Sequence, residues 1–261
     1  MRSPGRWPSG IDQTHLPESW NGAAPRRIES GKTNAETRAR EPLNRAQCGL
    51  EKQRNLQVAP RRLGRAFFAR QTLNVARELL GQKLIRLDPG GVRLSGWIIE
   101  TEAYIGSDDL GCHARHGRTA RNESMWGPAG RAYVYFTYGK HWMLNIVTEA
   151  EGLPAAVLIR GLFPDEGLPS MRRRRRGSPD ARLTDGPAKL CQALGINRSF
   201  DGVDLCRAET PLFLESLPQV DEASVTRSPR VGLNSVPEPW QSVPWRFRVR
   251  ADIVQGLFKE D

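Results

Sequence analysis

Two glutamates and a tyrosine occupy alternate positions in the stretch W-I-I-E-T-E-A-Y, residues 97–104. The apolar start of this stretch predicts a β-strand, in which every second side chain points to the same face of a sheet. Glu100, Glu102 and Tyr104 should therefore share one face. Carboxylates beside an aromatic surface suit a pocket that holds a planar ligand and performs acid or base chemistry on it. Glutamates at alternate strand positions are also typical of a solvated face, so both interpretations stay open here.

A second strand is predicted at residues 133–139, Y-V-Y-F-T-Y-G, where Gly139 allows the chain to turn. The loop between the two strands is rich in glycine and polar side chains. Its candidate functional residues are His113, His116, Arg118, Arg121 and Asn122. A polar loop held between strands is a common place for functional residues, so we expect the pocket at this loop.

The order of these motifs resembles the alkyladenine (3-methyladenine) DNA glycosylase family. No single motif is specific, but the ordered set is, and the resemblance covers roughly residues 62–254. The matching motifs are E-A-Y (102–104), His113, G-R-T-A-R-N (117–122), Y-V-Y-F-T-Y-G (133–139), Asn145, V-L-I-R (157–160) and G-P-A-K-L-C-Q-A-L-G-I-N (186–197).

The resemblance implies a base-excision-repair enzyme that flips alkylated or deaminated purines out of duplex DNA and hydrolyses the N-glycosidic bond. Glu102 matches the general base, which would take a proton from the water that attacks the sugar C1′. Arg160 matches the arginine that holds this carboxylate and the water. The matched pocket positions include no lysine, so a Schiff base and strand cleavage are not expected.

The resemblance also assigns the residues that bind the substrate base. Tyr104, His113 and Tyr135 match positions that enclose the flipped base, and flat rings suit a planar, positively charged purine. Asn145 matches an amide that rejects the exocyclic amino group of guanine.

DNA contacts are expected on the same part of the chain. Tyr138 matches the residue that fills the gap left by the flipped base. We also expect Arg118, Arg121 and Lys140 to bind DNA. Lys140 stands where an apolar side chain is usual in the family.

Composition agrees with a polyanionic partner. Lys and Arg together number 39 against 29 for Asp and Glu, which gives a net charge of +10. The expected partner is double-stranded DNA that contains damaged purines, bound by a monomer. No apolar run approaches the roughly 18 residues of a membrane span, so no membrane partner is expected. The location that follows is the cytoplasm and nucleoid of a bacterium, or the nucleus of a eukaryote.

The four cysteines have no paired spacing and are interpreted as thiols. Cys112, His113 and His116 could form half of a metal site, but no second half stands at usable spacing. We therefore expect neither a metal nor another cofactor.

Residues 1–60 are basic, rich in Pro, Gly and Ser and poor in aliphatic residues, which predicts a disordered extension. Residues 61–257 are expected to form one catalytic domain of the α+β class, with flanking helices on a curved, mostly antiparallel sheet. The Arg172–Arg176 run predicts a solvated loop that could also contact phosphates. The expected helices cover about 62–81 and 187–194, and the expected strands cover 83–87, 92–104, 133–139, 142–148, 155–163, 231–233 and 245–253.

Two other functions remain open. Glu100 and Glu102 would lie roughly 7 Å apart on a strand, a separation that inverting sugar hydrolases use. The net charge and the arginine-rich loops do not favour a neutral oligosaccharide. A non-catalytic nucleic-acid-binding protein could instead use the tyrosines and arginines as a stacking platform. Such a protein should tolerate Gln at position 102.

Overall fold

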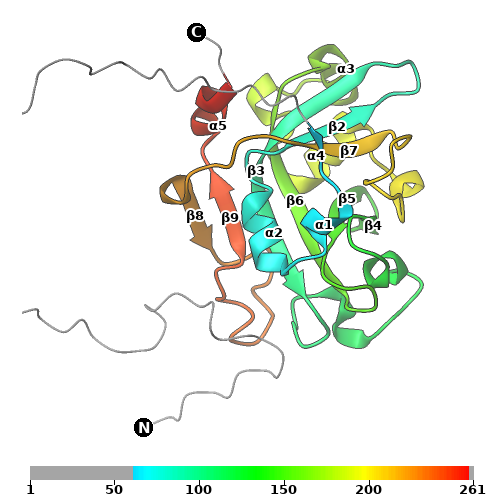
Figure 1. Ribbon diagram of the computed structural model, residues 1–261, viewed down its shortest axis with the longest axis vertical. Coiled ribbons are helices and arrows are strands. Elements are labelled where there is room, and N and C mark those ends of the chain that lie inside the picture. Colours follow the sequence, from blue (N-terminus) through cyan, green and yellow to red (C-terminus); the bar gives the residue numbers. More distant parts are fainter. Residues whose placement is uncertain (1–60, 259–261) are drawn as a thin grey trace, which may run out of the picture. The chain divides into compact units, whose positions relative to one another are not determined.

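The computed structural model describes residues 61–258, which form an α+β unit around one curved antiparallel sheet (Figure 1). The predicted fold class is therefore confirmed. The predicted extension over residues 1–60 lies outside the described residues.

Seven strands follow one another across the sheet. Their order is β1 (Arg61–Arg62), β7 (Leu212–Ser216), β2 (Lys83–Leu87), β3 (Arg93–Ile105), β6 (Ala155–Pro164), β5 (His141–Val147) and β4 (Ala132–Thr137). Two further strands, β8 (Val225–Ser228) and β9 (Arg246–Val249), pair with each other, and β9 also pairs with β3. The long strand β3 thus pairs with β6 along one edge and with β2 and then β9 along the other.

The pairing of β3 with β6 is interrupted by two adjacent bulges. Ile98 pairs with Leu162 and Glu100 pairs with Gly161, which leaves Ile99 as an extra residue on β3. The next pair joins Thr101 to Ile159, which leaves Arg160 as an extra residue on β6. Bulges bend a strand and redirect side chains, and they occur often beside active sites. Here they bring Arg160 to the two glutamates of β3.

The two faces of β3 have different environments. The hydroxyl of Thr101, which is buried, donates to the carbonyl of Ala76 in helix α2 (Thr72–Glu78). Glu100 and Glu102 point the other way and both contact Arg160. The predicted alternation of side chains along this strand is therefore confirmed.

The remaining helices are short. They are α1 (Arg65–Phe68), α3 (Leu168–Arg174), α4 (Pro187–Leu194) and α5 (Ala251–Phe258). Helix α4 has the predicted bounds, with proline in its first turn and Gly195 in the left-handed region (φ 67°) after its last turn. The polar loop contains two 3₁₀ turns, at His113–His116 and Glu123–Trp126.

Several predicted elements were wrong in extent. The single helix expected at 62–81 is instead two helices, α1 (Arg65–Phe68) and α2 (Thr72–Glu78). In the segment between them, the side chain of Arg70 donates from Nε to the carbonyl of Phe67. Residues 231–233 form a turn and not a strand, because Gly232 adopts a positive φ of 83°. The segment 245–253 is a strand only to Val249, after which α5 begins at Ala251.

The Arg172–Arg176 run was wrong as a loop, because its first three residues belong to α3. The solvated part of the prediction holds for Arg172, Arg173 and Arg176, which are exposed. Arg172 pairs with Asp180, and Arg174 pairs with Asp88 in the β2–β3 turn. These ion pairs attach the run to the fold and neutralise part of its charge.

Candidate active site

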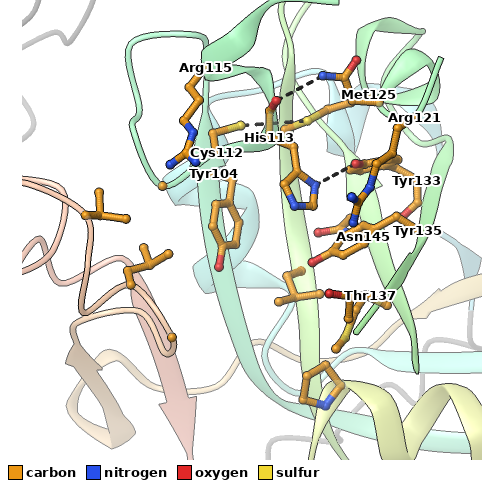
Figure 2. A pocket seen from close by; sticks show the side chains of 18 of the residues that line it. Tyr104, Cys112, His113, Arg115, Arg121, Met125, Tyr133, Tyr135, Thr137 and Asn145 are labelled. Carbon is orange, nitrogen blue, oxygen red and sulfur yellow. Dashed lines mark hydrogen bonds between the residues drawn. The ribbon is translucent and has the colours of Figure 1, made fainter. Parts of the chain in front are cut away.

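A cavity of about 740 Å³ opens among β3, β4, β5, β6 and two loops (Figure 2). Its walls include seven of the ten predicted site residues: Tyr104, His113, Arg121, Tyr135, Tyr138, Asn145 and Arg160. Glu102 lies directly behind this wall, and Arg118 and Lys140 do not line the cavity. The size is typical of pockets for small ligands and exceeds that of a single purine.

Glu102 is fully buried and accepts hydrogen bonds from three donors. The amide of Val231 donates to Oε1 at 2.7 Å, and the Tyr104 hydroxyl donates to Oε2 at 2.9 Å. Arg160 Nη1 donates to Oε2 at 3.3 Å. All three donor residues line the cavity. A carboxylate offers about four acceptor sites, so these three donors satisfy most of them.

The pKa of Glu102 is raised above its ordinary value. Burial is the largest cause, and the negative charge of Glu100 adds to it. Arg160, the Val231 amide and the Tyr104 hydroxyl act in the opposite direction because they stabilise the ionised form. A carboxylate balanced in this way suits a proton acceptor near neutral pH.

Arg160 joins the two glutamates of β3. Its Nε donates to Glu100 Oε1 at 2.8 Å while Nη1 contacts Glu102. Two further guanidinium groups, those of Arg246 and Arg248, lie 3.8 and 3.6 Å from Glu100. Glu100 therefore lies among three arginines, whereas Glu102 contacts only Arg160 of these and lies directly behind the cavity wall.

Aromatic rings form the sides of the cavity. Figure 2 shows Tyr104 on one side and His113 with Tyr135 on the other. The His113 and Tyr135 rings meet edge to face with centroids 4.4 Å apart, and Tyr133 packs on Tyr135 at 5.3 Å. His113 Nδ1 lies 2.8 Å from the Tyr133 hydroxyl, which fixes the orientation of the imidazole.

The His113 and Tyr135 rings of the cavity are neutral at neutral pH. Partial burial, together with the nearby cations of Arg121 and Arg115, lowers the pKa of His113 to about 4. Burial, with the charge of Glu102 as the second cause, raises the pKa of Tyr135 to about 12. Neutral rings can stack on a positively charged base without repulsion.

Two asparagines have separate roles at the cavity. Asn122 is buried and organises the polar loop, because its Nδ2 donates to the carbonyls of His113 and Gly117 and its Oδ1 accepts from the Thr119 amide. Asn145 is buried in β5 and donates from Nδ2 to the carbonyl of Tyr133 at 3.1 Å. This bond holds the Asn145 amide at the cavity wall.

Tyr138 lies at the tip of the β4–β5 hairpin and is 83% exposed. Its φ of 50° is in the left-handed region, which a tyrosine seldom adopts. Gly139 and the exposed Lys140 complete the turn, and the Lys140 amide donates to the carbonyl of Thr137.

The two predicted DNA-binding arginines differ in position. Arg121 lines the cavity, donates to the carbonyl of Phe136 and places its guanidinium 5.8 Å from the Tyr135 ring. Arg118 is exposed and forms a two-fold hydrogen-bonded ion pair with Glu123. The structure therefore brings Arg121 to the predicted pocket but not Arg118.

Sequence reasoning missed the contribution of the loop that follows Arg230, of which Val231, Gly232, Leu233, Ser235 and Val236 line the cavity. Their apolar character suggested a strand, but the flanking Pro229 and Gly232 are typical of a turn. Val231 contacts Glu102 through its backbone amide, which every residue except proline has, so the residue type at this position does not indicate the contact.

Within residues 61–258, no group of three or more His, Cys, Asp or Glu side chains is placed to hold a metal ion. The same residues contain no helix of the length and apolar character that a membrane span needs.

Comparison with known proteins places the chain in a family. Residues 66–253 match the family model described as Methylpurine-DNA glycosylase (MPG). A protein of Myxococcus xanthus is 48% identical over 189 residues, which are 72% of this chain and 90% of the relative. A protein of Chlorobium luteolum is 45% identical over 185 residues, 71% and 91% of the two chains. An archaeal relative from Methanocella arvoryzae is 46% identical over 188 residues, 71% and 90%. Each is provisionally named a 3-methyladenine DNA glycosylase.

The family match covers the motifs at the cavity, from Glu102 to Val231. The chain therefore belongs to the methylpurine-DNA glycosylase family.

Proposed function

We propose that this protein is a DNA glycosylase that hydrolyses the N-glycosidic bond of alkylated or deaminated purines in duplex DNA. The observation that supports it best is the buried carboxylate of Glu102 behind the wall of an aromatic cavity. The family membership and the names of the relatives point to the same substrate class.

The hairpin tip opens the duplex. A base inside the helix is out of reach of a cavity, so its nucleotide must rotate out of the stack. Tyr138 inserts its exposed ring into the gap that remains, and Lys140 and Arg121 bind the nearby backbone. Net charge of +10 favours the initial encounter with DNA.

The extruded purine enters the cavity between Tyr104 on one side and His113 with Tyr135 on the other. The neutral rings favour an electron-poor, alkylated base through stacking and cation–π attraction. Asn145 lies at the wall with its amide fixed by the Tyr133 carbonyl, where it excludes a base that carries the amino group of guanine.

Glu102 then activates water. The water oxygen attacks C1′ of the sugar, its proton passes to Glu102, and the electrons of the C1′–N bond leave with the base. The negative charge of Glu102 also stabilises the positive charge that develops on the sugar. Arg160 holds the carboxylate in its ionised form.

The products are a free base and an abasic site in an intact strand. Strand cleavage by a glycosylase needs an amine that forms a Schiff base with the sugar. Of the described residues that line the cavity, none is a lysine.

The two alternative functions are less well supported. Glu100 and Glu102 hold the same Arg160, so they do not flank a sugar as two hydrolase carboxylates would. A protein that only binds phosphates gains nothing from a buried carboxylate at position 102.

The test is incubation with duplexes that contain 3-methyladenine, hypoxanthine or 1,N6-ethenoadenine, followed by separate detection of free base, abasic sites and strand breaks. Free base and abasic sites without enzyme-dependent breaks are expected. An undamaged duplex is the control. Binding of the damaged duplexes without release of any base would contradict the proposal.

A further inference from the structure

Behind Tyr104, Asp109 and Arg230 form an ion pair in which both side chains are fully buried. The pair has two parallel hydrogen bonds, Nη1 to Oδ2 at 2.5 Å and Nη2 to Oδ1 at 2.8 Å. Neither residue lines the cavity, and neither has a part in the chemistry described above. A buried ion pair is weak evidence for stability, because the cost of removing two charges from water offsets most of their attraction.

The carboxylate of Asp109 organises the loop after β3. It accepts hydrogen bonds from the amides of Ile105 at 3.2 Å and Gly111 at 2.9 Å. The approach is close, because a Cβ on Gly111 would lie 2.8 Å from Arg230 Nη2 and 2.7 Å from a methyl carbon of Leu233. The pair thus fits a space that only glycine leaves open.

Arg230 connects the C-terminal loop to the catalytic strand. Its Nη1 donates to the carbonyl of Ala103, the residue between Glu102 and Tyr104. Its guanidinium lies 4.7 Å from the centre of the Tyr104 ring and 5.1 Å from that of Trp245.

The residue after Arg230 is Val231, whose amide donates to Glu102 Oε1. Two of the three groups that donate to Glu102 thus adjoin Arg230: the Val231 amide follows it in the chain, and the Tyr104 ring packs near its guanidinium. The third donor, Arg160, comes from β6 and is independent of the pair.

We propose that the Asp109–Arg230 pair positions the donors of Glu102. The pair fixes the Val231 amide at Oε1 of Glu102 and the Tyr104 hydroxyl at Oε2. This inference rests on the proposed role of Glu102 as the general base. Asp109 and Arg230 touch neither the base nor the water and act only through Val231 and Tyr104.

The inference predicts a shift in the pH profile. The charged and titratable groups around Glu102 are Glu100 and Tyr104 on β3, Arg160 on β6, Tyr135 on β4, and Arg246, which is the partner of Glu102 on β9. If the Val231 amide moves away, Glu102 loses a donor to its ionised form. Its pKa then rises, and a higher pH is needed to ionise the base.

The test uses the double variant Asp109→Asn/Arg230→Gln, which removes both charges together and leaves no unpaired ion. Single-turnover release of hypoxanthine is measured across pH on protein shown to be folded by circular dichroism. We expect the maximal rate, reached once Glu102 is ionised, to fall by about 10²-fold, the scale of a misplaced reacting group. We also expect the acid limb of the profile, in which the rate rises as Glu102 ionises, to move to higher pH.

A milder variant tests the same pair without changing any charge. Gly111→Ala places a Cβ 2.8 Å from Arg230 Nη2 and 2.7 Å from Leu233, so both side chains must move, and we expect the same two changes at smaller size. Because Gly111 also lines the cavity, the position of the pH profile, and not the rate alone, reports on the ion pair. Gly90→Ala is the matched control, because a Cβ there meets nothing within 4 Å, and its rate and profile should equal those of the parent. This variant decides the question if the double variant does not fold.

Glu102→Gln, measured in parallel, separates the two levels of the argument. If it retains the parent rate, the proposed general base is wrong. If it is inactive while Gly111→Ala and the folded double variant keep the parent rate and acid limb, the positioning role alone is wrong. A loss of stability with an unchanged acid limb would show that the pair is merely structural.

Discussion

Glu102 and its three donors, which lie behind the cavity wall and are called the floor below, differ from the tip of the β4–β5 hairpin in burial, hydrogen bonding and backbone conformation. Glu102 on the floor is fully buried, and three donors satisfy its oxygens. Tyr138 at the tip is 83% exposed and holds a backbone conformation that tyrosine seldom adopts. Glu102 is thus held by hydrogen bonds from the surrounding protein, whereas most of the Tyr138 side chain lies in solvent.

The difference indicates where each part does its work. Pre-organised, satisfied groups perform chemistry well because they need no rearrangement in the transition state. An apolar ring left exposed on a strained turn is useful only when a partner covers it. In our account the floor breaks the glycosidic bond and the tip holds the duplex open.

The largest expected effect is on the floor. Arg160→Met leaves Glu100 and Glu102 without their shared cation, so the free energy of unfolding should fall by about 3 kcal/mol, as when one partner of a buried ion pair is removed. Denaturant titration measures this change. Arg118→Met, which removes an exposed ion pair with Glu123, is the control and should leave stability unchanged. If the two substitutions lowered the free energy of unfolding equally, the buried ion pairs of Arg160 would be no different from an exposed surface pair.

The next effect is at the tip. Tyr138→Ser removes the ring that fills the gap, so the extruded state should lose on the order of 2 kcal/mol, comparable to part of the cost of unstacking a base. Hypoxanthine opposite a stable partner should suffer most, and hypoxanthine in single-stranded DNA least. Tyr138→Phe keeps the ring and should behave like the parent. A uniform slowing of all substrates by Tyr138→Ser would contradict the wedge role.

A smaller effect is expected in the pH dependence of the rate, which should depend on Glu102 and not on Tyr138. The rate should rise about tenfold per pH unit until Glu102 is ionised and then level off. Because the pKa of Glu102 is raised, this limb should lie above the ordinary glutamate value of 4.5. Tyr138→Ser should change the height of the profile but not the position of its limb. A limb that moved with the tip variant would mean that the two regions are not independent.

The smallest effect is expected from the N-terminal residues. Among residues 61–258, those that line the cavity lie between Tyr104 and Val236. Removal of residues 1–58 should therefore leave the single-turnover rate unchanged, although DNA binding could weaken at low salt, where basic residues contribute most. Loss of cooperative unfolding in the shortened protein would show that these residues belong to the fold.

Local patterns predicted the parts of the site that lie within one strand. The alternation at residues 100–104 predicted the shared face of Glu102 and Tyr104, and the predicted bounds of α4 match the observed ones. The exposure of Tyr138 followed from its place beside Gly139.

Contacts between distant segments were not predictable from such patterns. The bulge that leaves Arg160 unpaired depends on how β6 pairs with β3, and the period-two pattern of one strand does not show where an extra residue is inserted. The Val231 amide is a backbone donor and has no side-chain signature. The ion pairs of the arginine run were not predicted, because its partners, Asp88 and Asp180, come from outside the run.

The most direct test compares two identical substitutions on one strand face. Glu100→Gln and Glu102→Gln each replace a carboxylate that contacts Arg160, but only Glu102 is the proposed base. Single-turnover release of hypoxanthine should fall by about 10²-fold or more in Glu102→Gln and stay within about tenfold of the parent in Glu100→Gln, with DNA binding retained in both. Equal rates in the two variants, or a larger loss in Glu100→Gln, would contradict the account.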